Sequence, residues 1–154
     1  LIYRNYKEKY DFKLIKNIKN FCKKNKRELY ISNNLKLALR LNLNGVYIPA
    51  FNKLCKYKNL NSNKNFKIIG SAHNLPEIKN KEIQGCSSIF IAPLFKTGKS
   101  NYFLEVVKFN FLTRCVKKNI IALGGINSSN IKKINLTNSK GFASISWIKK
   151  NRPK

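Results

Sequence analysis

Acidic residues, histidine and methionine are scarce in this sequence, and each shortage narrows the chemistry open to the chain. Six carboxylates stand against 32 lysines and arginines, Asp11 is the only aspartate, and His73 is the only histidine. Magnesium sites in proteins are normally built on carboxylates, so we expect no metal site of paired carboxylates here. The four cysteines are scattered without a C-x-x-C pair, which argues against a zinc centre.

Long apolar runs and a signal peptide are also missing. No stretch is long enough to span a membrane, and the first residues already have the composition of a strand. Because the chain starts with Leu1 and not with methionine, we expect an N-terminus that has been cut. Free cysteines are typical of a reducing compartment, which favours a cytoplasmic location.

The positive charge is large, but it is not concentrated. A net charge of +26 normally suggests a nucleic-acid partner. The lysines are spread over the whole chain together with asparagine and isoleucine, as an A/T-rich coding sequence would produce. No nucleic-acid motif accompanies them, so we expect nonspecific attraction to polyanions at low salt but no specific nucleic-acid partner.

Short apolar segments alternate with amphipathic ones along the whole chain. The expected strands are 1–6, 28–32, 45–48, 66–71, 88–92, 120–123 and 141–145. The expected helices are 12–25, 34–41, 75–84, 103–117 and 129–136, with a poorly defined helical turn in 49–57. Such alternation predicts a parallel sheet with right-handed crossovers, and the short units favour a closed barrel. We therefore predict an α/β fold, a TIM (β/α)₈ barrel that lacks its first β/α unit in this chain.

The length of 154 residues suits one domain, which we place at 1–150, followed by a basic tail at 151–154. Within it, the segment 119–131 reads NIIALGGINSSNI, an apolar strand followed by two glycines and helix-capping residues. Glycines let backbone N–H groups face outward, and a helix start adds further donors, so this order suits a phosphate site. An ordinary strand-to-helix turn would have the same pattern.

Polar residues follow several of the expected strands, at the end where barrel enzymes carry their sites. His73 comes directly after one strand, beside Ser71, and either a structural or a catalytic role fits it. The cluster TGKS at 97–100 lies in the longest loop, where it suits a mobile anion clamp or a set of solvated charges.

Four motifs follow one another in the second half of the chain. They are IIGSAHN at 68–74, GCSSIFIAPLFKT at 85–97, ALGGIN at 122–127 and GFASIS at 141–146. In this order and spacing they resemble the family of thiamine-phosphate synthases and their relative, the thiazole tautomerase TenI. The resemblance covers nearly the whole chain and implies the (β/α)₈ barrel fold.

The resemblance also implies roles for single residues. In a synthase of this family, pyrophosphate leaves a pyrimidine with the help of Mg²⁺, and the nitrogen of a thiazole phosphate captures the pyrimidine cation. The implied catalytic residues are His73, Ser71 and Arg4. The implied ligands of the substrate phosphate are Thr97, Lys99, Gly124, Gly125, Ile145 and Ser146. The partners would be these two small phosphorylated molecules, with a homo-oligomer as a further expectation.

Departures from the family pattern gather at the pyrophosphate side. The family's first motif, Q-x-R-x-K, keeps only Arg4, and Asn33 and Asn52 replace the aspartates that bind Mg²⁺. Asparagine offers a neutral oxygen without charge, so the cofactor that the resemblance implies has lost its carboxylates here. Glu105 also stands where the family usually has glycine.

Three functions therefore remain open within the resemblance. The first is a thiamine-phosphate synthase, a transferase of thiamine biosynthesis. The second is a TenI-like tautomerase, whose chemistry needs acid–base help from His73 and no metal. The third is a catalytically impaired relative that binds thiazole phosphate. A polyanion-binding module is a distant fourth.

Overall fold

The computed structural model describes residues 1–6, 10–55, 65–98, 101–145 and 147–148. Within them, seven strands form a parallel sheet in which each strand pairs with the next along the chain. The strands are β1 (Ile2–Tyr3), β2 (Tyr30–Ser32), β3 (Gly45–Ile48), β4 (Lys67–Ala72), β5 (Ser88–Ile91), β6 (Asn119–Leu123) and β7 (Gly141–Ala143). The main helices are α1 (Phe12–Lys24), α2 (Leu35–Arg40), α3 (Leu75–Ile83), α4 (Glu105–Thr113) and the 3₁₀ helix η2 (Ile131–Leu136).

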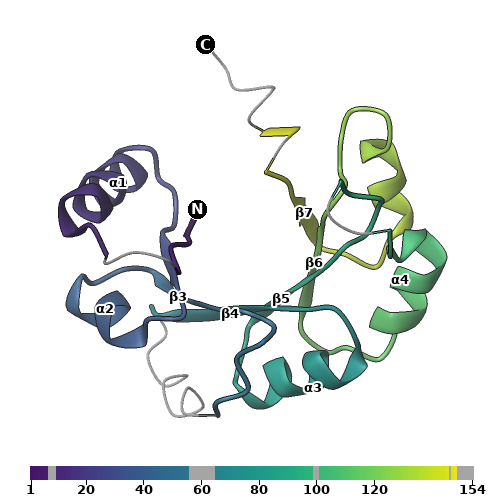
Figure 1. The fold of residues 1–154 in the computed structure, drawn as a ribbon, viewed down its shortest axis with the longest axis horizontal. Helices are drawn as coiled ribbons and strands as arrows, with labels where there is room; N and C mark the ends of the chain where they lie inside the picture. Colours follow the sequence, from purple (N-terminus) through teal and green to yellow (C-terminus); the bar gives the residue numbers. More distant parts are fainter. Residues whose placement is uncertain (7–9, 56–64, 99–100, 146, 149–154) are drawn as a thin grey trace.

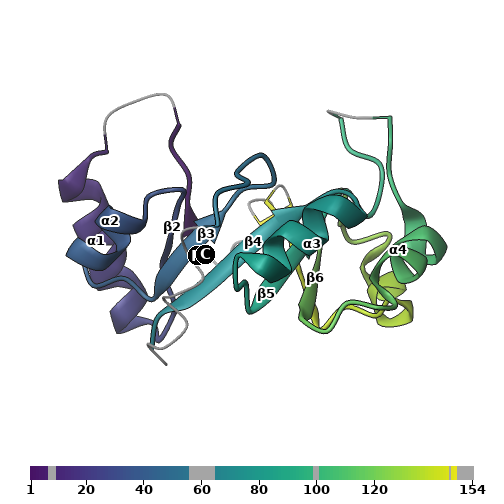
Figure 2. The same cartoon turned by 90° about the horizontal axis from the view of Figure 1, so that it is seen from below.

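The sheet is curled, and the helices lie outside the curve (Figures 1 and 2). In the described residues β1 and β7 each pair with a single neighbour, so they form the two edges of an open half-barrel. Parallel strands in sequential order with outer helices are the layout of a (β/α)₈ barrel. The predicted fold class is confirmed.

The two faces of the sheet carry different side chains. The larger apolar cluster joins strand residues such as Ile68 to helix residues such as Ile78 and Phe109, so it fills the space between the sheet and its helices. Tyr30, Tyr47 and Ile69 form a separate cluster without helix residues, which places them on the inner face. No helix among the described residues is long and apolar enough to cross a membrane.

Three helices begin where the sequence provides a capping side chain. The carboxylate of Asp11 accepts from the N–H of Leu14 at the start of α1, at 2.9 Å. Asn34 and Asn74 cap α2 and α3 in the same way. Such caps satisfy backbone donors that a helix start would otherwise leave unpaired. Asn34 and Asn74 each lie two residues after a strand, so these two caps fix where the chain turns from strand to helix.

Several local expectations were wrong. Residues 49–55 form no helix, and the rest of that predicted turn lies outside the described residues, as does the tail at 151–154. The helix expected at 103–117 is shorter: α4 starts at Glu105, which has a φ of 54°, and ends at Thr113. Glycine adopts this left-handed conformation freely, whereas a residue with a Cβ such as glutamate is strained in it. Cys115, which lies at an apolar position of the expected helix 103–117 and would be buried there, is exposed.

Burial of Cys86 predicts a loss of stability at high pH. Its side chain is fully buried, and burial raises the pKa of the thiol to about 12 from 9.0. The unfolded chain therefore loses this proton first, so stability falls as pH rises above 9. For this group alone we expect a loss of about 2 kcal/mol between pH 8 and 10.5.

Urea unfolding of the wild type and of Cys86→Ala across this pH range measures that loss. The variant should show a shallower decline, whereas Cys55→Ala, at an exposed cysteine, should follow the wild type. If the free energy of unfolding fell equally with pH in the wild type and in Cys86→Ala, the loss would not come from the thiol of Cys86.

Candidate functional site

The turn after β6 consists of two glycines with positive φ. The angles are 95° at Gly124 and 70° at Gly125, a backbone conformation that favours glycine. Asn130 and Asn127 donate side-chain hydrogen bonds to the carbonyl of Gly125, at 2.9 and 3.3 Å. Among the described residues, no acceptor is bonded to the N–H of Gly124 or Gly125. The turn therefore presents two backbone donors at the carboxyl end of a parallel strand, as an anion site requires.

The loop after β5 packs directly on this turn. The N–H of Leu94 donates to the carbonyl of Leu123 at 2.8 Å, and the N–H of Phe95 donates to that of Gly124 at 3.1 Å. A Cβ on Gly125 would lie only 2.5 Å from the carbonyl oxygen of Lys96. The backbone on both sides of this contact is thus fixed, and Thr97 follows immediately, half-buried. Thr97 is therefore the next residue after a backbone contact with the glycine turn, while Lys99 lies outside the described residues.

The end of β7 is tied to the same turn by Ser144. Its hydroxyl donates to the carbonyl of Ile126 at 3.1 Å. Ile145 follows with its side chain exposed, and Ser146 lies outside the described residues. Sequence reasoning left Ser144 out of the predicted site, although its place directly after a strand was a usable signal.

Tyr47, on the inner face, interacts with both Ser71 and Arg4. The guanidinium carbon of Arg4 lies 5.3 Å from the ring centre of Tyr6, whose hydroxyl is 2.6 Å from that of Ser32. Burial raises the pKa of Tyr47, and this outweighs the lowering by a hydrogen bond with Ser71 and by the charge of Arg4. A guanidinium and hydroxyl groups thus share one polar patch, which can receive an anion.

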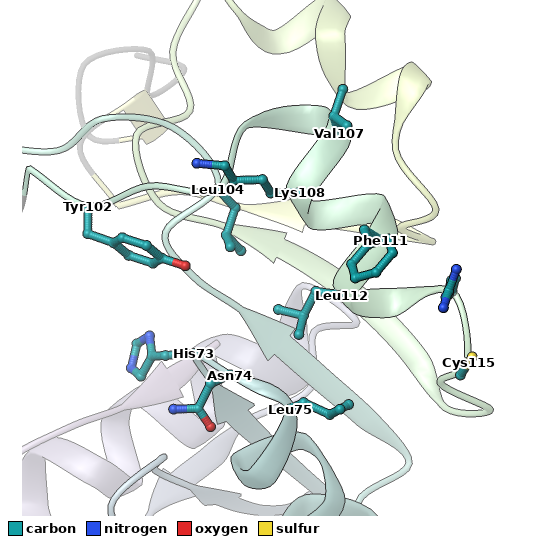
Figure 3. Close-up of a pocket in the computed structure, with 11 residues that line it drawn as sticks. His73, Asn74, Leu75, Tyr102, Leu104, Val107, Lys108, Phe111, Leu112 and Cys115 are labelled. Carbon is teal, nitrogen blue, oxygen red and sulfur yellow. The ribbon is translucent and has the colours of Figure 1, made fainter.

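His73 occupies a separate position, at one end of a groove between α3 and α4. Its Nδ1 lies 2.7 Å from the carbonyl oxygen of Ala92, and a carbonyl can only accept, so this nitrogen carries the proton. Nε2 is left as the acceptor of the neutral ring. Figure 3 shows the ring facing Tyr102 across the groove, which has a volume of about 590 Å³. His73 is connected to the glycine turn through the β5 loop, because it bonds to Ala92 and Gly124 packs on the next residue, Pro93.

Asn33 and Asn52 are in direct contact. The side-chain amide of Asn52 donates to the Oδ1 of Asn33 at 2.5 Å, and its own Oδ1 accepts from the N–H of Leu54 at 2.8 Å. Asn33 has a φ of 58°, which asparagine tolerates better than most residues. The loops after β2 and β3 are therefore joined by two neutral amides.

Lys81 of α3 and Gln84, the residue that caps the end of α3, bond to the backbone beside this contact, and sequence reasoning missed both. The ammonium of Lys81 is fully buried and donates to the carbonyl of Asn52 at 2.8 Å and to Oε1 of Gln84 at 2.9 Å. Burial lowers the pKa of Lys81. The available signal was its spacing of three residues from Ile78, which places both on one helix face.

Comparison with known proteins decides the family. A family model described as thiamine monophosphate synthase matches residues 1–148. The chain belongs to the thiamine monophosphate synthase family. It is 32% identical over 143 residues to a thiamine-phosphate synthase of Prochlorococcus marinus, and 27% identical over 154 residues to one of Clostridium tetani. These matches cover 86% and 94% of this chain but 39% and 70% of the relatives, so the chain spans about two fifths of the Prochlorococcus protein.

Solved structures support the fold of this family member. A thiamine phosphate pyrophosphorylase from Pyrococcus furiosus matches with a TM-score of 0.74 at 17% identity, covering 94% of this chain and 69% of that one. FabK from Thermotoga maritima matches with a TM-score of 0.66 at 16% identity, covering 88% and 47%. At such identities the likeness shows the shared fold.

The magnesium ion that the family implies does not fit the residues of this chain. The described residues contain no group of three or more histidines, cysteines, aspartates or glutamates that could hold a metal. At positions 33 and 52 the side chains available to a metal ion are neutral amides. The oxygen of each amide already accepts a hydrogen bond within the protein. Mg²⁺ prefers charged carboxylates.

Proposed function

We propose that this chain binds a thiazole phosphate at the Gly124–Gly125 turn and couples it to a pyrimidine pyrophosphate, as a thiamine-phosphate synthase does. The observation that carries the proposal is the pair of unbonded N–H groups at this turn, at the carboxyl end of β6. The resemblance assigns Thr97, Lys99, Ile145 and Ser146 to the same phosphate site. Family membership supplies the reaction class.

In the proposed reaction, the bond between the pyrimidine methylene carbon and the pyrophosphate oxygen breaks, and pyrophosphate keeps the electron pair. The thiazole nitrogen then forms a bond to that carbon. Arg4 and Ser71 would receive the pyrophosphate on the inner face, since they contribute a cation and a hydroxyl beside Tyr47. With asparagine at positions 33 and 52, the Mg²⁺-bound pyrophosphate would lose several kcal/mol of charge stabilisation. Each loss of about 1.4 kcal/mol slows the reaction about tenfold.

We therefore expect slow coupling that does not respond to chelation. Thiamine phosphate formed from the two substrates should appear at a rate at least about 100-fold below that of the Prochlorococcus relative assayed in parallel. EDTA should leave the slow rate unchanged. A rate equal to that of the relative, or one abolished by EDTA, would show that metal-assisted chemistry survives in this chain.

A second function, thiazole phosphate tautomerisation, is favoured by the position of His73. Its Nε2 is the acceptor nitrogen of the neutral ring, and the reaction needs proton transfer without a metal. If this function holds, His73→Ala should slow aromatisation of the thiazole by about 100-fold or more. An unchanged rate would remove the tautomerase from consideration and leave coupling or binding alone.

A further inference from the structure

Lys81 is unusual because its positive charge is buried without a carboxylate partner. Its side chain is fully inaccessible, and the ion pairs of the described residues are Lys67 with Glu28 and Lys79 with Glu82. Burying an ammonium is costly unless its protons are bonded. Here two of the three protons are bonded, to the carbonyl of Asn52 at 2.8 Å and to Oε1 of Gln84 at 2.9 Å. The bond to Asn52 connects this buried charge to the loop after β3.

Gln84 repeats the contact on the same loop. Its side-chain amide donates to the carbonyl of Asn52 at 2.9 Å and to that of Leu54 at 3.0 Å. Together with Lys81, it places three donor contacts from the C-terminal end of α3 and its cap on the backbone at 52–54. This segment has no helix or strand of its own. Its course after β3 is therefore supported by two side chains about 30 residues later in the chain, one in α3 and one at its C-cap.

The position of Asn52 is passed on to the next loop. With its carbonyl held by α3, the Asn52 side chain accepts from the N–H of Leu54 and donates to the Oδ1 of Asn33. Asn33 is held in turn, because its N–H donates to the carbonyl of Tyr47 at 2.8 Å. A continuous series of bonds thus runs from Lys81 to the loop after β2.

The electrostatics of this series oppose a cation. A divalent ion shared by residues 33 and 52 would join the two loops through its ligands, but here an amide hydrogen bond already joins them. The ammonium of Lys81 lies against the carbonyl of Asn52, and like charges repel strongly away from bulk water. With neutral amides at positions 33 and 52, no negative charge offsets the ammonium beside the backbone of residue 52, which disfavours a bound cation there.

We propose that Lys81 is a positioning residue that, together with Gln84, holds Asn52 against Asn33 and so joins the loops after β2 and β3 without a metal ion. This inference concerns the folded chain alone. It stands whether or not the chain couples the two substrates, and its test uses no substrate.

The test follows the side-chain amide signals of Asn33 and Asn52 by NMR of the ¹⁵N-labelled chain. Lys81→Met keeps the length of the side chain and removes its donors, so we expect the signals of both asparagines to shift. Those of Asn127, at the glycine turn, should stay in place. The matched control is Lys79→Met on the exposed side of the same helix, which should move neither Asn33 nor Asn52.

Two further measurements complete the test. Gln84→Met should shift the same two asparagine signals, which keeps the test usable if Lys81→Met does not fold. In the wild type, adding MgCl₂ should leave both pairs of signals where KCl of equal ionic strength leaves them. Signals that stay fixed in both variants, or that move with Mg²⁺ in the wild type, would overturn the proposal.

Discussion

Gly125→Ala should lower the free energy of unfolding by about 3 kcal/mol or more and remove binding of thiazole phosphate. A Cβ at this position would lie 2.4 Å from the carbonyl oxygen of Phe95 and 2.5 Å from that of Lys96. These are backbone atoms, which cannot rotate away as a side chain would. The positive φ of Gly125 adds strain for alanine. The β5 loop would have to move off the turn, and Thr97 would move with it.

Gly98→Ala is the matched control for this substitution. It lies in the same β5 loop, yet a Cβ there would meet no atom within 4 Å. Its stability should stay within about 0.5 kcal/mol of the wild type, with thiazole phosphate binding retained. Urea unfolding and calorimetry on the two variants provide the comparison. A Gly125→Ala chain as stable as Gly98→Ala would contradict the close packing between the β5 loop and the glycine turn.

Asn33→Asp combined with Asn52→Asp should make the stability of the chain depend on Mg²⁺. At 2.5 Å the wild-type amides form a hydrogen bond, whereas two carboxylates at that separation repel each other. In EDTA we expect the double variant to lose about 2–4 kcal/mol, and Mg²⁺ should restore much of it, because it neutralises both charges. The wild type should show no such response.

Thermal unfolding in EDTA and in MgCl₂, at matched ionic strength, measures this difference. Each single Asp variant serves as a control, because one carboxylate beside one amide creates less repulsion and a weaker ion site. If the wild type gained as much stability from Mg²⁺ as the double variant, the amide contact would not have replaced a metal site.

The glycine turn shows how far the sequence could predict this molecule. The strand before the turn and the position of the turn in the barrel follow from local patterns. An apolar run indicates a buried parallel strand, and a pair of glycines indicates backbone with positive φ. The helix after it could not be placed as well. Asn127, Ser129 and Asn130 bond to one another in the loop, and the next turn is the 3₁₀ helix η2. These residues are of the type that caps helices, but in this structure their hydrogen bonds close a turn before η2.

Lys81 shows what the sequence could not predict. A lysine in an amphipathic helix is normally assigned to solvent, and its spacing of three residues from Ile78 does not by itself show that it is buried. Its burial depends on the carbonyl of Asn52, 29 residues earlier, which only the fold brings within reach. Glu105 is an intermediate case. The family pattern marks glycine there, and the structure supplies the reason as a φ of 54°.

Calorimetric titration of the chain with thiazole phosphate in EDTA tests the central claim most directly, that the phosphate site is kept while the metal site is lost. We predict saturable binding in EDTA, equal affinity after MgCl₂ is added, and competition by inorganic phosphate. Absence of binding, or binding that appears only with Mg²⁺, would contradict the account.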